Sequence, residues 1–580
     1  MPHVITQSCC SDGSCVYACP VNCIHPTPDE PGFGTAELLH IDPVACVDCG
    51  ACVSACPVGA IAPDHKLTAD QLPFIAINES FYPERPADEK LPPTSKLAPI
   101  IEAPAIAARR GGPLRVAVVG SGPAAMYAAD ELLTQKGVEV NVFERLPTPY
   151  GLVRAGVAPD HQATKRVAAL FDRMARHDGF RFYLNVTVGQ HVSHDELLRY
   201  HHAVVYAVGA PSDRRLDIPG FGLPGTGTAT DVVAWINAHP DFAALPVDLR
   251  HPRAVIVGNG NVALDVARIL TADTGRLART DISDTALLAL RDSHLQEVVI
   301  AARRGPAESA FTLPELIGLT QTARVVLDEA DHELVRAELA RTTDRQTRLK
   351  LEVLAALGTA SDTGPDAGPD TGPRIRLAYR LTPRQVLGED RATAIEFTVT
   401  GTDKTRTLQA GLVLSSIGYR GRPIPGLPFD DDAAVVPNRH GRVFDPRTDA
   451  PVPGRYVAGW IKRGPTGFIG TNKSCAQDTI RSLVDDYNNG LLAHPAAKPA
   501  ALDALVRARQ PDVVDGARWR AIDRAEIERG QADGRPRDKF VTVAEMLAVP
   551  YTPARRPALD RLMPLDPRHR RWRMPLSLLG

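Results

Sequence analysis

The sequence predicts an α/β protein with two β-α-β units, preceded by a small α+β domain rich in cysteine. Nine of the ten cysteines lie within the first 56 residues. A glycine turn at residues 120–122 and another at residues 258–260 each follow an apolar run and precede an amphipathic stretch. At about 150 residues per domain, the 580 residues suffice for roughly four domain-sized units.

Composition and charge exclude several classes of partner. The chain has 44% hydrophobic and 23% charged residues, which are ordinary values for a globular protein. Its 66 Lys and Arg residues nearly balance its 68 Asp and Glu residues, so no basic field favours nucleic acid or an anionic membrane as a partner. No apolar run reaches the about 20 residues of a membrane span, and residues 1–8 lack the features of a secretion signal. We therefore expect a cytoplasmic protein.

The cysteine-rich segment, residues 1–75, contains two related runs. Cys46-x2-Cys49-x2-Cys52-x3-Cys56-Pro57 has the spacing of the bacterial iron–sulfur run, in which three thiolates hold one cluster and the fourth reaches another. Cys9-x2-Asp12-x2-Cys15-x3-Cys19-Pro20 repeats that spacing with Asp in the second place. Zinc also accepts thiolates, but nine clustered cysteines and two Cys-Pro endings favour iron and sulfur. Exchange of the fourth ligand predicts two sets: Cys19, Cys46, Cys49 and Cys52 for one cluster, and Cys9, Cys15 and Cys56, with Asp12 as a candidate, for the other.

Asp12 leaves the type of the second cluster open. A carboxylate can complete a [4Fe-4S] cluster as a harder ligand, or that corner can stay empty in a [3Fe-4S] cluster. Cys10 and Cys23 fall outside the repeat, and we expect them to be unligated, with Cys10 as an alternative to Cys9.

A proline-rich linker, residues 76–113, separates this segment from the first β-α-β unit; seven prolines fall within residues 83–113. A strand over 114–119 then turns through Gly120-x-Gly122-x-x-Ala125 into a helix over 124–133. The next strand, 139–143, ends at Glu144, where an acid can bind ribose hydroxyls. The turn and the helix N-terminus suit a pyrophosphate, and a buried strand over 203–210 ends near Gly209. These features predict an FAD site.

The second unit repeats this arrangement with one difference in charge. A strand over 254–257 leads through Gly258-x-Gly260-x-x-Ala263 into a helix over 262–270, and a later strand spans 297–301. Arg303 and Arg304 follow that strand in place of an acid. Two guanidinium groups can bind a 2′-phosphate, so the expected nucleotide is NADP(H).

The remaining patterns complete the predicted domain organisation. Residues 361–373 are a low-complexity loop, and a helical segment, 491–550, precedes a basic tail, 551–580. We expect an FAD domain made of 114–211 and 415–490, with an NADP domain, 212–414, inserted in it.

Several motifs resemble known families. Residues 1–75 resemble the bacterial two-cluster ferredoxins, which carry single electrons. Residues 146–161, 257–267 and 459–472 resemble the adrenodoxin reductase family of NADPH-ferredoxin reductases, and the whole chain resembles the actinobacterial fusion of a ferredoxin with such a reductase. The resemblance implies two Rossmann-like domains preceded by a ferredoxin-like domain.

The resemblance also implies residue roles. It adds His161 as a proton-handling residue, although the acidic partner expected near Gly318 is absent from the sequence and a relay is therefore disfavoured. The implied FAD contacts are Gly120, Gly122, Ala125, Glu144, Leu152, Val188, Trp460, Gly467, Phe468 and Ile469, and the implied NADP contacts are Arg214, Gly258, Asn259, Gly260, Asn261, Val262, Arg303, Arg304, Glu315 and Gly467.

The predicted activity is that of a ferredoxin–NADP reductase, in which a hydride passes from NADPH to FAD and single electrons pass to iron–sulfur clusters. The acceptors would be the chain's own ferredoxin domain, an external ferredoxin, or another one-electron acceptor such as a cytochrome P450 system. Residues 1–75 hold eight acidic residues and one Lys, while the rest holds 60 acidic and 65 basic residues, which favours docking of the two parts. The alternatives are an electron-input subunit resembling the small subunit of glutamate synthase and a non-catalytic electron carrier.

Overall fold

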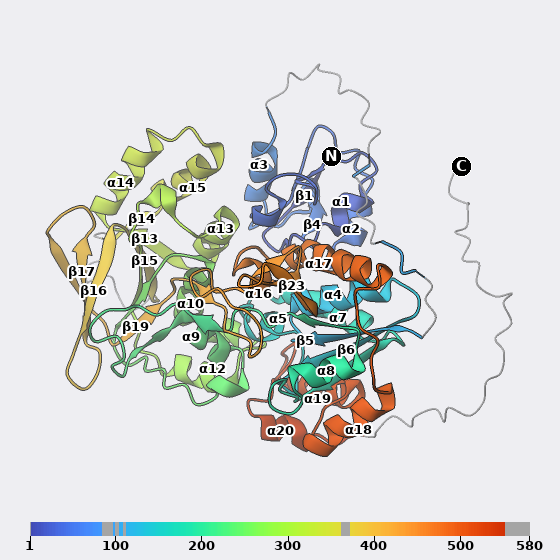
Figure 1. The fold of residues 1–580 in the computed structure, drawn as a ribbon. Coiled ribbons are helices and arrows are strands. Elements are labelled where there is room, and N and C mark those ends of the chain that lie inside the picture. The colour runs from blue at the N-terminus through green and yellow to red at the C-terminus, as the bar shows by residue number, and fades with distance from the viewer. Residues whose placement is uncertain (1, 84–96, 99–103, 108–111, 361–371, 552–580) are drawn as a thin grey trace.

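The computed structural model describes residues 2–83, 97–98, 104–107, 112–360 and 372–551 (Figure 1). The predicted loop at 361–373, except its last two residues, lies outside the described part. So do most of the predicted linker and all of the basic tail after residue 551.

The N-terminal domain is built from two similar halves. The halves each contain one short helix, and both helices begin after a glycine with positive φ, 72° at Gly13 and 73° at Gly50. Both end at a cysteine in extended conformation, Cys19 and Cys56, so the repeat in the sequence is also a repeat in the backbone. The elements are β1 (His3–Ile5), paired antiparallel with β4 (Ile61–Pro63), β2 (Ile24–His25), paired with β3 (His40–Ile41), and helices α1 (Ser14–Ala18) and α2 (Ala51–Ala55).

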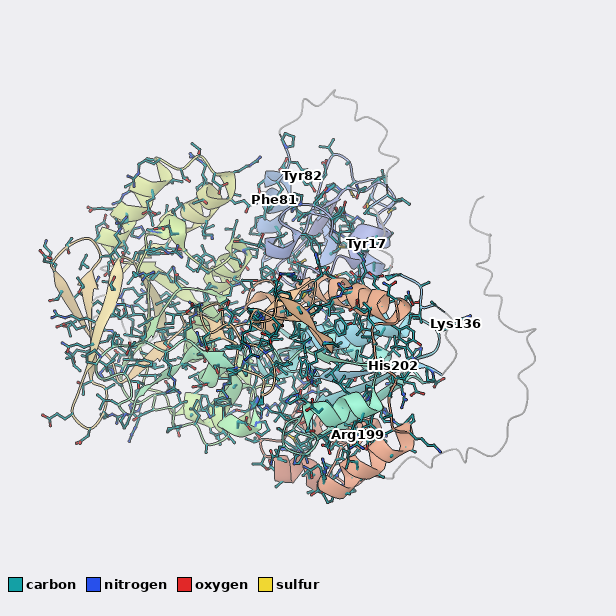
Figure 2. The ribbon with its side chains drawn as sticks, viewed as in Figure 1. Tyr17, Phe81, Tyr82, Lys136, Arg199 and His202 are labelled. Carbon is teal, nitrogen blue, oxygen red and sulfur yellow. The ribbon has the colours of Figure 1, made fainter. Side chains whose placement is uncertain are left out.

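A third helix, α3 (Pro73–Ser80), closes this domain and extends beyond residue 75, where the linker is predicted to begin. Phe81 and Tyr82 follow it and are labelled in Figure 2. The Phe81 ring stacks on His40 with 3.7 Å between ring centroids, and the Tyr82 hydroxyl donates to the His40 carbonyl at 3.0 Å. The domain therefore ends with an ordered aromatic contact.

The first large sheet has seven strands in the order β21-β22-β23-β8-β5-β6-β7. Its five strands from β23 to β7 are parallel, whereas β21 and β22 add an antiparallel edge. Helices α4 and α17 pack against each other over one face, as Figure 1 shows. The bounds are β5 (Leu114–Val119), α4 (Pro123–Leu133), β6 (Val138–Glu144), α5 (Leu152–Ala155), α6 (Gln162–Lys165), α7 (Val167–Met174), β7 (Phe180–Leu184), α8 (His194–Tyr200), β8 (Ala203–Tyr206), β21 (Asn438–Arg439), β22 (Arg442–Asp445), β23 (Ala450–Val457), α16 (Trp460–Arg463) and α17 (Thr471–Asn488).

The second large sheet also has seven strands, all parallel, in the order β10-β19-β11-β12-β15-β13-β14. A three-stranded antiparallel sheet, β16-β17-β18, stands beside it. The bounds are β10 (Thr226–Thr228), α9 (Ala229–Ile236), β11 (Arg253–Val257), α10 (Asn261–Thr271), α11 (Thr274–Leu277), α12 (Asp284–Arg291), β12 (Glu297–Ala301), α13 (Leu313–Thr322), β13 (Arg324–Leu327), α14 (Glu329–Leu339), α15 (Arg345–Ala355), β14 (Gly358–Thr359), β15 (Arg374–Ala378), β16 (Leu381–Leu387), β17 (Ala394–Val399), β18 (Thr405–Gln409) and β19 (Leu412–Ser415).

The second sheet is inserted between β8 and the edge strands of the first. The two connecting segments pair with each other through β9 (Ser212–Asp213) and β20 (Tyr419–Arg420), which run antiparallel. Two Rossmann-like units, one inserted in the other and preceded by a small α+β domain, confirm the fold class that the sequence predicts.

The C-terminal helices, α18 (Pro499–Arg509), α19 (Gly516–Ala532) and α20 (Val543–Ala548), pack beside the first sheet. Val514 exchanges backbone hydrogen bonds with Leu184 at the end of β7. The segment after α19 also reaches the second unit, because Asp281 there binds two buried ammonium groups at 2.7 and 2.8 Å. These groups, Lys165 and Lys539, are called the buried lysine pair below. The C-terminal segment thus fixes the two nucleotide-type units to each other.

The N-terminal domain packs on both units. Leu313 and Ile317 of α13 share a hydrophobic cluster with residues of the N-terminal domain, and Cys10 and Val58 belong to the core of the first unit. None of the helices in the described part of the chain combines the length and the apolar character that a bilayer-spanning segment requires.

Candidate nucleotide and iron–sulfur sites

The first glycine turn is shaped by close approach of the backbone. Gly120 has a φ of +99°, and a Cβ there would lie 2.4 Å from the Ala207 carbonyl oxygen, so only glycine fits. Gly122 precedes α4, and no atom lies within 4 Å of a Cβ built on it. The helix N-terminus therefore faces open space, as the pyrophosphate of a dinucleotide requires.

The residues expected around FAD converge on this turn from three segments. Glu144, at the end of β6, accepts hydrogen bonds from the Ser121 backbone at 3.1 Å and from its hydroxyl at 2.8 Å. Ala125 is fully buried in α4, whereas Leu152, the first residue of α5, is 41% exposed beside the turn. Val188, the remaining residue of this set, lies outside these three segments. It follows β7 and pairs with Val192 in an isolated bridge.

The segment after β23 forms the other side of this site. Trp460 begins α16, its indole N–H donates to the Thr466 carbonyl at 3.1 Å, and its ring lies 4.9 Å from that of Tyr419. Gly467 has a φ of +80°, and a Cβ on it would lie 2.8 Å from Thr471. The next two residues are Phe468 and Ile469; the Phe468 N–H donates to the Thr471 hydroxyl at 2.9 Å. These bonds hold a small-residue loop over the start of α17, which suits stacking of two flat rings.

The second glycine turn has the same construction. Gly258 has a φ of +110°, with the Ser416 carbonyl oxygen 2.2 Å from a built Cβ, and Gly260 opens α10 toward empty space. The Asn261 side chain accepts from the Thr312 N–H at 2.9 Å, and Asn259 accepts from Ala310 at 3.4 Å. Val262, half-buried, is the next residue of α10. The structure therefore places a second helix N-terminus in position for a phosphate.

The basic residues expected for NADP lie at the same edge of the second sheet. Arg303 and Arg304 follow β12 directly and are exposed, and Arg304 lies 3.7 Å from Glu308 in an exposed ion pair. Arg214, also exposed, donates its backbone N–H to Gly418 beside the paired connections. All three arginines are thus exposed at this edge, where an anionic ligand could approach them.

Glu315 belongs to a half-buried polar cluster between the units. It lies in the first turn of α13, and its carboxylate is 4.0 Å from the His161 Nε2 atom. The acid that the sequence did not offer at position 318 is therefore present one helical turn earlier. Asp265 completes the group, since ligand atoms of these three residues lie within 4.8 Å of one another. Positions 315 and 318 are three residues apart and therefore lie on the same face of α13. This spacing is the signal that could have revealed Glu315 as the acidic partner of His161.

Charge in this cluster is balanced by Arg268. Its guanidinium binds Asp160 at 2.6 and 3.0 Å and Asp265 at 2.7 Å. Burial would raise the pKa of Asp160, but the Arg268 charge outweighs burial and lowers it. Burial raises the pKa of Glu315, and the charge of Asp265 raises it further. The Glu315 carboxyl group therefore takes up a proton more readily than an exposed carboxyl group does.

Gln7 of the N-terminal domain enters the same cluster, which the sequence did not indicate. Its amide donates to the Glu315 carboxylate at 3.2 Å. A Cβ built on Gly318 would lie 2.2 Å from the Gln7 amide nitrogen, so the missing side chain at position 318 makes room for Gln7. The N-terminal domain is therefore part of the wall of the candidate NADP site.

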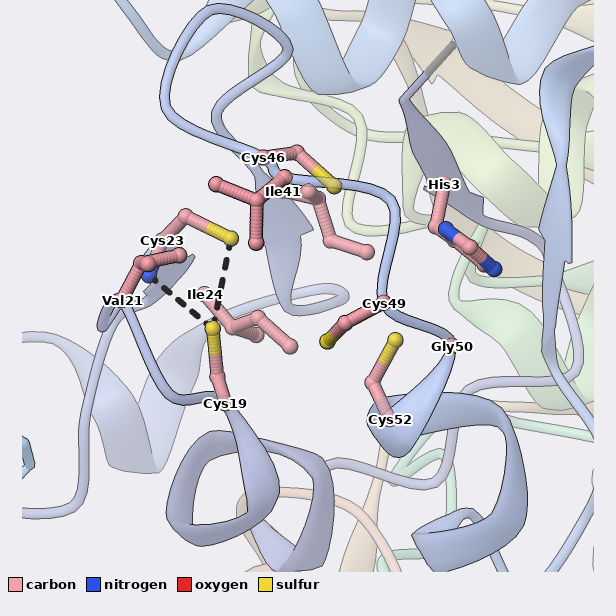
Figure 3. A pocket seen from close by; sticks show the side chains of 11 residues that line it. His3, Cys19, Val21, Cys23, Ile24, Ile41, Cys46, Cys49, Gly50 and Cys52 are labelled. Atoms are coloured by element: carbon pink, nitrogen blue, oxygen red, sulfur yellow. Dashed lines mark hydrogen bonds between the residues drawn. The ribbon is translucent and has the colours of Figure 1, made fainter. Parts of the chain in front are cut away.

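The cysteines of the N-terminal domain form two groups. Cys19, Cys46, Cys49 and Cys52 line one pocket together with His3, Gly50 and the four apolar residues Val21, Ile24, Ile41 and Val47 (Figure 3). Cys23 also lines it; its thiol lies 3.4 Å from that of Cys19. We call the four-cysteine group the outer cysteine site.

The second group is buried against the first unit. The sequence assigns Cys9, Asp12, Cys15 and Cys56 to this group; Cys15 and Asp12 are 5% and 6% exposed, and Cys9 and Cys56 pack against the same hydrophobic cluster as Cys15. We call them the inner site. The Asp12 carboxylate accepts a hydrogen bond from Ser14 and lies 4.0 Å from the Lys473 ammonium group. Four thiolates at one point and three thiolates with a carboxylate at the other fit two iron–sulfur clusters.

Comparisons with known proteins agree with this arrangement. The family model described as pyridine nucleotide-disulphide oxidoreductase matches residues 114–304, and that of the 4Fe-4S dicluster domain matches residues 8–60. A probable ferredoxin/ferredoxin–NADP reductase of Mycobacterium bovis is 68% identical over 569 residues, covering 97% of this chain and 98% of that protein.

Relatives without the N-terminal domain match the rest of the chain. The mitochondrial NADPH:adrenodoxin oxidoreductase of Arabidopsis thaliana is 38% identical and covers 75% of this chain and 95% of that protein. The structure of Mycobacterium tuberculosis FprA in complex with NADPH superposes with a TM-score of 0.68 at 41% identity, covering 75% of this chain and 99% of that one. Because the similarity to the Mycobacterium bovis protein spans both the cysteine-rich domain and the two nucleotide-type units, this chain belongs to the ferredoxin/ferredoxin–NADP reductase family.

Proposed function

We propose that the chain oxidises NADPH at its two nucleotide sites and delivers the electrons one at a time to iron–sulfur clusters held by its N-terminal domain. One contact carries this proposal. The Gly470 N–H, directly after the expected flavin-contacting residues 467–469, donates to the Cys10 carbonyl at 2.7 Å. The chain therefore brings its cysteine sites within reach of its flavin site.

The residues of the chain divide the work between binding and positioning. The backbone N–H groups at the starts of α4 and α10 bind the two pyrophosphates, and Arg303 and Arg304 bind the 2′-phosphate that distinguishes NADPH from NADH. Bound FAD supplies the exchange between a hydride and single electrons. The loop at 467–470 leaves the two rings free to stack, and Glu315 lies 4.0 Å from His161 in the polar cluster at the start of α13.

The finer assignments are part of the same proposal. The outer cysteine site, with four thiolates, would hold a [4Fe-4S] cluster. The inner site would hold a [4Fe-4S] cluster with Asp12 as a ligand or a [3Fe-4S] cluster without it. External acceptors would include a ferredoxin or a cytochrome P450 system, and thiolate ligands favour a reducing compartment such as the cytoplasm.

An anaerobic titration of the purified holoprotein tests this function. NADPH is added in steps while visible absorption and low-temperature EPR are recorded, and NADH serves as the matched control. We expect NADPH to bleach the flavin and then to produce an iron–sulfur signal, with NADH much less effective. A protein without bound flavin, or one that NADPH leaves fully oxidised, would contradict the proposal. A three-iron signal in the oxidised sample would assign the inner cluster.

A further inference from the structure

We infer that the N-terminal domain is a relay with a fixed direction: the inner site receives electrons from the flavin side, and the outer cysteine site delivers them to a partner protein with a basic surface. This inference rests on the proposed function and adds the order of the two sites and the place of the partner. It follows from three differences between the two cysteine sites.

The first difference is contact with the reductase part. The Ser11–Asp12 backbone lies against Gly470, where a Cβ would be 2.1 Å from the Asp12 nitrogen, so only glycine permits this approach. The Lys473 ammonium group donates to the Ser14 hydroxyl at 3.1 Å and faces Asp12. Gly470 and Lys473 directly follow the loop expected to contact the flavin, and both contact residues of the inner site. The inner site is therefore the cysteine site that is connected more directly to the expected flavin site.

The second difference is exposure. On the inner side, Cys15 and Asp12 are 5% and 6% exposed and Cys9 and Cys56 are half-buried, so none of the four is exposed. At the outer site, Cys19 and Cys52 are buried as well, but Cys49 is exposed, and the nearby Val44 and Val47 are 54% and 58% exposed. Exposed valines next to a redox site form an apolar rim that a partner can cover.

The third difference is charge at the two sites. Asp48 lies within the rim of the outer site, 42% exposed beside His3, whereas Asp12 at the inner site is 6% exposed and lies 4.0 Å from the Lys473 ammonium group. The whole N-terminal segment carries eight acidic residues and one Lys. A partner that covers the valines would also meet this negative field, so the fitting partner is a one-electron acceptor with basic residues around its redox centre.

The electron balance follows from the donor. Each NADPH loses two electrons and one proton and leaves as NADP⁺. The two electrons pass singly through the inner and then the outer site, and two acceptor molecules are each reduced by one electron.

Two cysteine variants test the order of the sites by stopped-flow absorption and freeze-quench EPR. In Cys49→Ser, we expect NADPH still to reduce the inner site. In Cys15→Ser, we expect NADPH to bleach the flavin while the outer site stays oxidised, although dithionite reduces it. Equal reduction of the outer site by NADPH in Cys15→Ser and wild type would overturn the order.

A charge variant covers the case in which Cys15→Ser loses both clusters, as iron analysis would show. Lys473→Glu places a negative charge beside Asp12, and we expect it to slow NADPH-driven cluster reduction about tenfold without slowing flavin bleaching. Lys498→Glu, at the exposed start of α18, is the matched control. Unchanged cluster reduction in Lys473→Glu would overturn the inner contact.

A rim variant tests the docking surface. Val44→Ser, which alters a rim residue outside the lining of the outer cysteine site, should raise the KM for basic cytochrome c about fivefold and leave the EPR titration with NADPH unchanged. Leu288→Ser, which alters a residue 59% exposed on α12, is the matched control. Equal KM values in both variants would contradict the assignment of the rim as the docking surface for the acceptor. Failure of NADPH to reduce the wild-type flavin would instead contradict the proposed function itself.

Discussion

Gln7 and Gly318 offer a double-variant test of how the N-terminal domain is fixed to the NADP site. The Gln7 amide donates to Glu315 at 3.2 Å across 308 positions of sequence. Gly318→Ala would place a Cβ 2.2 Å from that amide, so the Gln7 side chain must move away and lose the bond. Gln7→Ala removes the same bond without a clash.

The size of the expected effect depends on the strength of this hydrogen bond and on the helix propensities of alanine and glycine. A hydrogen bond to a charged group contributes about 1.5–3 kcal/mol, and the half-buried contact places this one at the lower end. Gly318 lies within α13, where alanine is otherwise favoured over glycine by about 1 kcal/mol. We therefore expect each single variant to lower the free energy needed to open the contact by about 1.5 kcal/mol, which raises the equilibrium constant for opening about tenfold. In the Gln7→Ala background, Gly318→Ala should add no further loss.

Hydrogen exchange of the holoprotein, followed by mass spectrometry, measures this opening. Exchange of residues 3–9 should rise about tenfold in each single variant and no further in the double variant. Gln71→Ala is the matched control, because the Gln71 side chain bonds Thr68 within its own domain. A rise of about a hundredfold in the double variant would show that the two changes act independently and would refute the shared contact.

Three further predictions concern other parts of the chain. Arg303→Ala with Arg304→Ala should raise the KM for NADPH about tenfold and leave that for NADH unchanged; steady-state kinetics with both nucleotides checks this, and equal effects on both would contradict it. Burial lowers the pKa of His201 to about 4 in the folded state. The unfolded state therefore binds more protons between about pH 6.5 and 4, and the free energy of unfolding falls by up to about 3 kcal/mol as the pH drops through that window. Urea unfolding of wild type and His201→Phe at pH 5 and 7 should show a smaller pH effect in the variant. Asp281→Asn should destabilise the protein by about 3–5 kcal/mol, because it leaves the buried lysine pair without a counter-charge; a melting temperature equal to that of wild type would contradict this account.

Local patterns in the sequence predicted much of the scaffold. The strand expected at 297–301 is β12 as observed, and the helix expected at 262–270 is α10 with one more residue at each end. The strand expected at 203–210 ends earlier, at Tyr206, because the chain leaves the sheet where the Ala207 carbonyl meets Gly120. Periodicity and glycine turns act over about ten residues, and such signals are readable from one sequence.

The sequence by itself determined the chemistry that this protein can hold: two cysteine runs of iron–sulfur spacing, two glycine turns that open helices, and an arginine pair after one strand. Each of these motifs consists of residues that are close together in the chain, so the local backbone geometry fixes how those residues lie relative to one another. Only the tertiary structure decided which groups meet. Gln7 reaches Glu315, and Cys10 meets Gly470, across hundreds of residues. Those contacts arise from packing of whole domains, in which many weak contacts act together and leave no local pattern in the sequence.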